Sequence, residues 1–434
     1  MGFSLTKSEV TYVRPSQPTP LSLLELSVLD TSPALRNMVK TIHVYERGGE
    51  MAAKIIKEAL SEALVYYYPL AGRLKDSSDG KLLVDCSGEG IGFIEAEAEC
   101  RLEDLNFFDG DQAIPKEQLL YGSKNRVGEE DPLLVIQVTK FTCGGFVMGL
   151  DFCHTICDGF SSARFTSTVA ELARGVPHPS ILPVWARESL RPKQRPSSNN
   201  LGPQAVPPPA PDPPLPLPLP LPPQDSGLRE VCVDIPIETI ERLKQKYIQS
   251  TGVPCTTFEA IAAQVWRYRA RAIGMKENEV AELVFLANIR PFIKPPLPEG
   301  FYGNCFFPVD ISVNGATLAR AGLDDAVNWI KGGKARLPDD VARWMEGHVD
   351  ALIPKDLTYQ TLFVVEWSRL GFENIDFGWG PPVHVAPVPY SHVIPACIFA
   401  FPRVPNKGVR LMTWCVRGDH HEAFAKLMRS LAND

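Results

Sequence analysis

His154 and Asp158 are the two side chains whose chemistry and spacing point most directly to catalysis. They stand four residues apart in the run Asp151-Phe-Cys-His-Thr-Ile-Cys-Asp-Gly159. The unperturbed pKa of histidine lies near neutrality, so His154 can take a proton from a hydroxyl or an amine at the pH of the cell. A carboxylate four residues later can hold the loop in place, and Gly159 allows the backbone to turn tightly. We therefore expect a general base at His154.

A buried strand has to position His154. The apolar run 146–152 directly precedes the motif, and Cys143-Gly-Gly145 separates it from a second apolar run, 133–141. Two such runs joined by a short glycine-containing turn predict a hairpin. His154 would then lie where a central strand ends, which is where α/β folds commonly deliver catalytic side chains. Helical spacing resumes behind the motif, over residues 160–173.

Two other interpretations of this motif have to be considered. A single histidine beside a strand is often only a packed residue, and a short motif carries a risk of chance occurrence. A metal site is the other alternative, because Cys153, His154 and Cys157 fall within five residues. Zinc sites usually add a second ligand pair downstream, which this sequence lacks, so we expect no metal.

The chain divides at a proline-rich stretch. Residues 207–223 are dominated by proline, which cannot donate the hydrogen bonds of a helix or a sheet. We predict an exposed, polyproline II-like linker at 191–228, and we favour a spacer over a ligand for SH3 or WW domains. It separates an N-terminal domain, 1–190, from a C-terminal domain, 229–434.

Strand and helix patterns alternate on both sides of the linker. Before it, a helix is expected over 51–67 and a strand over 82–84. The patterns after it are a strand at 231–235, a helix at 237–247, a capping-box helix from Thr256 to Ala272, and a buried strand at 283–287. This mixture suggests two α/β layers around a cleft, and clefts between domains commonly hold ligands.

Composition excludes several classes of protein. The chain has 434 residues, 44% of them hydrophobic, and a net charge of −7 from 44 basic and 51 acidic side chains. No basic block is present, so we expect no nucleic-acid partner. The scattered cysteines are typical of reduced core thiols, and neither a secretory signal nor a long apolar span is evident. We expect a cytoplasmic monomer without membrane insertion.

Five short motifs follow one another in a fixed order. They are Tyr67-Tyr-Pro-Leu-Ala-Gly-Arg-Leu74, His154-Thr-Ile-Cys-Asp-Gly159, Asn288-Ile-Arg290, Tyr302-Gly-Asn304 and Asp376-Phe-Gly-Trp-Gly380. This series resembles the BAHD acyltransferases, the plant family that moves acyl groups from coenzyme A thioesters to alcohols and amines. The resemblance covers nearly the whole chain. A histidine motif followed far downstream by an intact DFGWG is a specific combination.

The resemblance implies both a fold and a mechanism. The fold would be α/β, with two domains of similar chloramphenicol-acetyltransferase-like fold, mixed sheets flanked by helices, and a channel between them. His154 would lie midway along the channel and remove the proton of the acceptor hydroxyl as its oxygen attacks the thioester carbonyl. No covalent acyl-enzyme is needed, because both substrates are held together. The coenzyme A thioester is then a co-substrate, and no cofactor is bound permanently.

The resemblance also assigns roles to other residues. Asp158 would pair with Arg290 and support the loop rather than relay protons. The DFGWG residues Asp376, Gly378, Trp379 and Gly380 would lie away from the histidine as packing and turn residues. Trp367 matches a tryptophan that helps hold the oxyanion in some relatives. Val365 replaces the serine or threonine that relatives commonly carry two residues before it, and a valine side chain cannot donate a hydrogen bond.

Substrate-binding residues are implied less specifically. Thr41 and His43 fall where relatives place acceptor-pocket residues. Thr256 and Thr257, at the start of a helix, suit the phosphates of coenzyme A. The basic residue that some relatives place just before this point is absent, because Pro254 and Cys255 stand there.

The leading functional hypothesis is O-acyl transfer from an acyl-CoA to an alcohol. The runs 301–306, 334–338 and 367–372 resemble those of grass hydroxycinnamoyl-CoA transferases, so we expect a p-coumaroyl or feruloyl donor. Similar runs occur in members that use benzoyl- or acetyl-CoA, and N-acyl transfer to a polyamine is an alternative. Peptide-synthetase condensation domains share the two-domain plan but carry paired histidines, whereas Cys153 precedes His154. A catalytically inactive scaffold that recruits partners through its linker is the alternative from another class.

Overall fold

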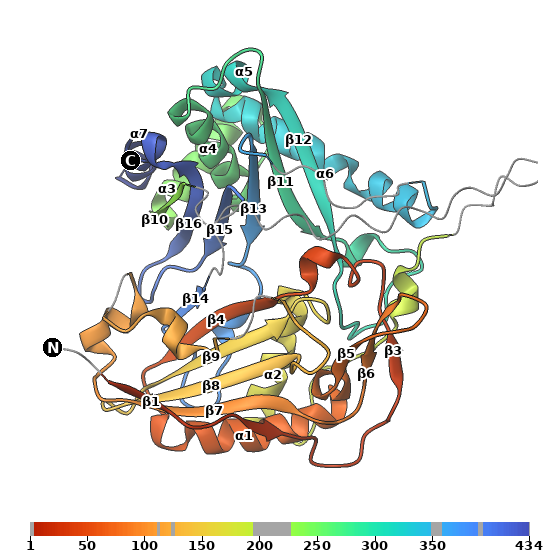
Figure 1. Ribbon diagram of the computed structural model, residues 1–434. Coiled ribbons are helices and arrows are strands. Elements are labelled where there is room, and N and C mark those ends of the chain that lie inside the picture. The colour runs from red at the N-terminus through yellow and green to blue at the C-terminus, as the bar shows by residue number, and fades with distance from the viewer. Residues whose placement is uncertain are drawn as a thin grey trace, which may run out of the picture.

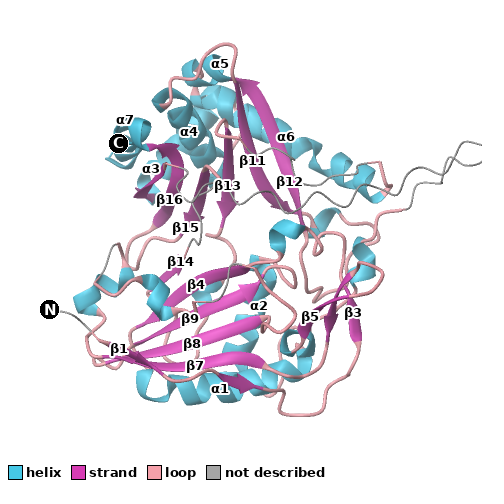
Figure 2. Ribbon diagram, in the orientation of Figure 1, coloured by secondary structure: helices cyan, strands magenta, loops and turns pink. Residues whose placement is uncertain are grey.

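The computed structural model describes residues 4–110, 113–122, 126–193, 227–348, 358–388 and 394–433. Within them the chain forms two α/β halves, each built on a mixed sheet, as Figures 1 and 2 show. The α/β fold class expected from the sequence is confirmed. The proline-rich stretch 207–223, with most of the expected linker 191–228, lies outside the described residues.

The N-terminal half contains a seven-stranded sheet and a three-stranded one. The larger sheet has the order β1 (Leu5–Lys7), β7 (Ile91–Ala98), β8 (Leu134–Phe141), β9 (Phe146–Cys153), β4 (Met38–Tyr45) and β14 (His384–Pro387), with β2 (Thr11–Val13) also paired to β7. The smaller sheet has the order β3 (Leu23–Glu25), β6 (Leu82–Asp85) and β5 (Arg73–Asp76).

The strand that leads to His154 is central and fully buried. β9 pairs antiparallel with both β8 and β4, and all of its residues are buried. A strand covered on both faces reads as a continuous apolar run, which is the pattern that the sequence shows. Helices α1 (Gly49–Tyr66) and α2 (Gly159–Ala173) pack together on one face of the sheet. The predicted 133–152 hairpin and the two predicted helices are confirmed.

The C-terminal half is a six-stranded sheet packed against helices. Its order is β10 (Leu228–Pro236), β16 (Gly408–Arg417), β15 (Ala396–Ala400), β13 (Thr361–Glu366), β11 (Val280–Asn288) and β12 (Phe306–Asn314). The helices are α3 (Ile237–Thr251), α4 (Thr257–Ala272), α5 (Gly315–Arg320), α6 (Leu323–Met345) and α7 (Gly418–Asn433). The parallel strands β11, β13 and β15 all end at the same edge of the sheet.

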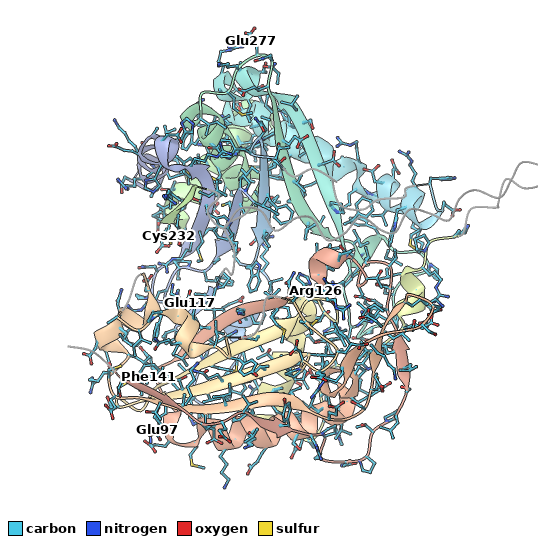
Figure 3. All side chains as sticks on the ribbon, viewed as in Figure 1. Glu97, Glu117, Arg126, Phe141, Cys232 and Glu277 are labelled. Atoms are coloured by element: carbon cyan, nitrogen blue, oxygen red, sulfur yellow. The ribbon has the colours of Figure 1, made fainter. Side chains whose placement is uncertain are left out.

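Short 3-10 segments connect several of these elements. They are Pro33–Leu35, Tyr68–Ala71, Glu103–Phe108, Lys116–Leu119, Arg187–Leu190, Arg290–Phe292 and Phe372–Asn374. Side chains fill the space between the ribbons in Figure 3, in which Glu277 lies at the far end of the C-terminal half and Glu97 at the far end of the N-terminal half. None of the described helices is long and apolar enough to cross a membrane.

The segment after β13 crosses from the C-terminal half to the N-terminal half. β14 pairs antiparallel with β4, so it forms the edge of the N-terminal sheet. The DFGWG motif precedes β14, and the ring of Trp379 packs edge-on against Phe146, 5.8 Å between centroids. In space, therefore, the 229–434 domain expected from the sequence contributes a strand and a motif to the other half.

Gly48 makes room for this motif. A Cβ at Gly48 would lie 2.3 Å from the Trp379 ring, and the residue has φ +94°. We predict that Gly48→Ala lowers the free energy of unfolding by about 2–4 kcal/mol, from the left-handed backbone and the clash together. Thermal or urea unfolding measures this loss.

Gly144 provides the matched control. It has φ +82° with no atom within 4 Å of an added Cβ, so Gly144→Ala reports the backbone cost alone. In a Trp379→Ala background, the cost of Gly48→Ala should fall to that of Gly144→Ala. An equal cost of Gly48→Ala in both backgrounds would contradict packing of the motif on Gly48.

Candidate active site

His154 follows the last residue of β9, at the end of a central strand. Its backbone N–H donates to the carbonyl of Asn37, 2.9 Å away, which fixes the start of the loop. The imidazole is partly exposed, and it lies near the rings of Phe152 and Phe306, at centroid distances of 6.4 and 6.0 Å. Phe306 opens β12, so both halves of the molecule surround the histidine.

Asn304 determines which ring nitrogen of His154 carries the proton. The Asn304 Nδ2 donates to Asp30 Oδ1 at 2.8 Å, to the carbonyl of His154 at 2.8 Å and to the carbonyl of Thr155 at 3.2 Å. Because all three are acceptors, the amide must present its Oδ1 to the imidazole, 3.1 Å from Nδ1. Nδ1 therefore carries the hydrogen, and Nε2 keeps a lone pair.

The surroundings of His154 favour its neutral form. Burial lowers its pKa from the ordinary value of 6.5, and interactions with Asp158, Asn304 and Asp30 offset this only in part. A neutral imidazole with a free Nε2 lone pair can accept a proton at neutral pH. The arrangement is thus suited to general-base chemistry.

The structure brings Asp158 and Arg290 together as a bidentate ion pair. Arg290 Nη1 donates to Asp158 Oδ2 at 2.9 Å, and Nη2 donates to Oδ1 at 3.2 Å. Asp158 is also the N-cap of α2, where it accepts from the Ser161 N–H, and it accepts from the Cys305 N–H. Arg290 Nη2 donates in addition to the carbonyl of Gly303 at 2.8 Å.

This pairing separates Asp158 from the histidine. Both carboxylate oxygens accept bonds from Arg290 and from the backbone, and the imidazole bonds Asn304 instead. Burial alone would raise the pKa of Asp158, but Arg290 and the Ser161 N–H outweigh it, so the pKa is lowered. The carboxylate stays ionised and supports the loop.

The DFGWG loop lies on the N-terminal half and closes on itself. Asp376 Oδ1 accepts from the N–H groups of Gly378 at 2.7 Å and of Gly380 at 2.8 Å. Both glycines have positive φ, which a turn with these bonds requires. The contacts of Trp379 with Phe146 and Gly48 do not include the catalytic loop.

A chain of side-chain contacts connects Trp367 to His43 and Thr41. The indole of Trp367 stacks on Phe372, with centroids 5.8 Å apart, and Phe372 meets His43 edge-on at 5.1 Å. His43 Nε2 is 3.0 Å from Thr41 Oγ1, and both residues are fully buried. Burial lowers the pKa of His43 to about 3, so its ring is neutral. Trp367 is connected to the Thr41–His43 pair rather than to the ring of His154.

Thr256 and Thr257 open α4, as the sequence predicts. Thr256 is the N-cap, and with Glu259 it forms the expected capping box. Two lysines of α6 stand at this end of α4. Lys331 Nζ donates to the carbonyl of Pro254, and Lys334 pairs with Glu259 at 2.5 Å. The charge of Lys334 is neutralised by Glu259, whereas Lys331 bonds a neutral carbonyl and keeps its positive charge.

Sequence reasoning did not assign a role to Asn304, Asp30 or Arg187. Asn304 belongs to one of the motifs quoted above, which was the available signal. Asp30 and Arg187 have no recognisable pattern around them, and they form a buried ion pair from which Arg187 Nη2 donates to the carbonyl of Ile156 in the histidine loop.

The arrangement of the whole chain defines the class of fold. Vinorine synthase has a TM-score of 0.70 to this structure, with 22% identity and coverage of 99% of this chain and 98% of that chain. F. sporotrichioides TRI101, complexed with coenzyme A and T-2, has a TM-score of 0.69, with 14% identity and coverage of 93% and 97%. The fold is therefore the two-domain, chloramphenicol-acetyltransferase-like α/β class.

Sequence comparison identifies the family. The Transferase family model matches residues 3–426. Acyl transferase 4 of Oryza sativa subsp. japonica is 38% identical, with coverage of 99% of each chain. Myricetin 3-O-glucosyl 1,2-rhamnoside 6'-O-caffeoyltransferase AT1 of Crocosmia x crocosmiiflora is 37% identical, with coverage of 98% of each chain. The chain belongs to this transferase family, the BAHD acyltransferases, which confirms the resemblance seen in the sequence.

Removal of the Asp158 charge should destabilise the protein. We predict that Asp158→Asn lowers the free energy of unfolding by about 3 kcal/mol, because Arg290 is left without its counter-charge. Because the pKa of Asp158 is lowered in the folded state, its stabilisation is complete above the unfolded value of about 3.9 and is lost as the pH falls through the folded value. Urea unfolding at a series of acidic pH values should therefore show a smaller pH dependence in the variant.

The exposed pair of Lys193 and Glu346 gives the comparison. Glu346→Gln should change the free energy of unfolding by less than about 1 kcal/mol. If the two substitutions had equal effects, the Asp158–Arg290 pair would not be the strong support that the geometry describes.

Proposed function

We propose that this acyltransferase moves a hydroxycinnamoyl group, such as p-coumaroyl or feruloyl, from coenzyme A to an alcohol, with His154 as the general base. The observation that carries the catalytic part is the 3.1 Å contact of His154 Nδ1 with Asn304 Oδ1, an acceptor, which assigns the proton to Nδ1 and the lone pair to Nε2. The caffeoyltransferase from Crocosmia, 37% identical to this chain, supports a donor of the hydroxycinnamoyl type.

The reaction balances without any covalent acyl-enzyme. His154 Nε2 takes the proton of the acceptor hydroxyl as its oxygen attacks the thioester carbonyl, which forms the new C–O bond. The tetrahedral intermediate then collapses, the C–S bond breaks, and the coenzyme A thiolate takes the proton from the imidazolium. Most of the rate enhancement would come from holding both substrates beside one base.

The developing oxyanion needs a donor other than residue 365. Val365 has no side-chain donor, so Trp367, a backbone amide or a water molecule has to serve. The stack of Trp367 on Phe372 fixes its indole plane, which is a requirement for a preorganised donor.

The coenzyme is proposed to approach from the α4 end of the C-terminal half. The first turn of α4 presents backbone N–H groups, and Lys331 adds positive charge beside Thr256 and Thr257, whereas the charge of Lys334 is paired with Glu259. TRI101, which shares the fold, is complexed with coenzyme A. No permanently bound cofactor and no metal enter the proposal.

The acceptor is proposed to lie on the side of Trp367, whose ring stacks on Phe372 and so leads to His43 and Thr41. Both of these are fully buried and would support the pocket wall from within. Amine acylation is the alternative, because 3'-N-debenzoyl-2'-deoxytaxol N-benzoyltransferase of Taxus canadensis is 33% identical over 88% of this chain. Taxadien-5-alpha-ol O-acetyltransferase of Taxus chinensis, at 34% identity, keeps an acetyl donor and an alcohol acceptor open as well. We further propose that the enzyme acts as a monomer in the cytoplasm.

Replacement of the base gives the first functional prediction. His154→Ala should lower kcat by about 100-fold or more, because the hydroxyl proton then has no positioned acceptor. In the wild type, kcat/KM should fall as the pH drops through the histidine pKa, which burial places below 6.5. Near-normal turnover of the variant across several acyl-CoA donors would sink the general-base proposal.

A screen of donors against acceptors tests the substrate proposal. Purified enzyme would be incubated with p-coumaroyl-, feruloyl-, caffeoyl-, benzoyl- and acetyl-CoA against alcohols and polyamines, with products identified by mass spectrometry. We expect hydroxycinnamoyl esters to form fastest. Preferential amide formation would instead support the amine alternative, and a complete lack of turnover would support an inactive scaffold.

A further inference from the structure

We infer that Asp30 is a positioning residue that fixes which ring nitrogen of His154 carries the proton, and that it acts through Asn304. The inference rests on the proposed general-base role of His154. It concerns a buried carboxylate of the N-terminal segment that does not contact the imidazole and lies in none of the motifs.

The carboxylate of Asp30 is enclosed by donors. Its side chain is fully buried, and Oδ2 accepts from the Ser27 N–H at 2.9 Å, from the Ser27 hydroxyl at 2.7 Å and from Arg187 Nη1. Oδ1 accepts from Asn304 twice, from the backbone N–H at 3.2 Å and from Nδ2 at 2.8 Å. A buried carboxylate needs this kind of satisfaction, because it has only acceptors to offer.

These bonds determine how the Asn304 amide is oriented. Asp30 is the only charged acceptor of the Asn304 Nδ2 among the described residues; the others are the carbonyls of His154 and Thr155. An ionised acceptor makes a hydrogen bond roughly twice as strong as a neutral one. The carboxylate is therefore the strongest of the three acceptors that hold Nδ2 on this side and turn Oδ1 toward His154 Nδ1.

Replacement of one carboxylate oxygen of Asp30 by an NH₂ group would oppose this orientation of the Asn304 amide. In an Asp30→Asn variant, the remaining oxygen is needed on the side of the Ser27 N–H and Arg187, which can only donate. The new NH₂ group would then face the N–H groups of Asn304. This contact of donor with donor offsets the hold that the carbonyls of His154 and Thr155 keep on Nδ2, so a fraction of the molecules would carry a flipped Asn304 amide. The flipped amide presents its NH₂ to the imidazole and requires Nδ1 to accept.

Arg187 ties the same carboxylate to the histidine loop. Its Nη2 donates to the carbonyl of Ile156 at 2.7 Å, between His154 and Asp158. The guanidinium passes so close to Gly303 that a Cβ there would lie 2.6 Å from Nη1. Asp30 thus contacts Asn304 directly and contacts the histidine loop through Arg187. The same carboxylate therefore helps to position both the imidazole's hydrogen-bond partner and the loop that carries the imidazole.

A purely structural role for Asp30 would predict a different result. If the Asp30–Arg187 pair only stabilised the fold, a folded variant would keep the wild-type histidine tautomer. The tautomer can be read from the ring nitrogens by long-range ¹H–¹⁵N NMR on protein labelled at histidine. The His154 signal is assigned by its loss in the His154→Ala variant.

The experiment compares wild type, Asp30→Asn and a control. We expect the wild type to show the Nδ1–H tautomer, and Asp30→Asn to show an added Nε2–H population. The kcat of this variant should fall about ten-fold, the factor for one poorly satisfied buried hydrogen bond, with KM values nearly unchanged.

The control variant is Asp234→Asn. Its carboxylate accepts from Arg410 at 2.6 and 2.7 Å, and it makes no contact with His154. This substitution should change neither the His154 tautomer nor kcat.

A second variant covers failure of the first to fold. Asp30→Leu with Arg187→Met replaces both buried charges by apolar side chains, which is often tolerated better than removal of one, and it leaves no side-chain acceptor at position 30 for the Asn304 Nδ2. The inference is overturned if a folded Asp30 variant keeps a pure Nδ1–H tautomer, or if its tautomer changes while kcat does not. The two proposals can fail separately. Full activity of His154→Ala would overturn the general-base role itself. An inactive His154→Ala together with an unaffected Asp30 variant would overturn only the inference about Asp30.

Discussion

The ion pair between Asp158 and Arg290 is the interaction on which the catalytic loop depends. Asp158 starts α2 in the N-terminal half, and Arg290 follows β11 in the C-terminal half. The guanidinium also lies over the ring of Phe160, 4.7 Å from its centroid, and bonds the carbonyl of Gly303. This one buried pair therefore contacts the start of α2 and the carbonyl of Gly303, and it joins the N-terminal half to the C-terminal half.

A second ion pair, Asp30 with Arg187, contacts the same loop through the carbonyl of Ile156. In both pairs the negative charge of the aspartate cancels the positive charge of the arginine. The histidine loop is therefore held by charged hydrogen bonds, although the net charge around it is small. This balance matters for the imidazole. An uncompensated carboxylate beside His154 would favour the imidazolium, whereas burial among neutralised pairs favours the form that can accept a proton.

Local features of the fold could be predicted from sequence because they depend on short-range patterns. The apolar run before His154 predicted β9, the capping box predicted the start of α4, and the motifs predicted the contact of Asp158 with Arg290. Asn304 and Asp30 are different, because their contact spans 274 residues and has no periodic signature. Likewise, β14 leaves its own half because of packing on β4, which four residues of sequence do not reveal.

β14 also affects the order in which the protein can be completed during synthesis. The N-terminal sheet cannot close its β4 edge until residues 384–387, which lie in the last eighth of the 434-residue sequence, have left the ribosome. Until then the edge that carries Thr41 and His43 has unpaired backbone groups, which is the kind of surface that joins with other chains. The N-terminal half is consequently incomplete on its own, because a strand from the C-terminal part of the chain completes the sheet that carries the histidine motif.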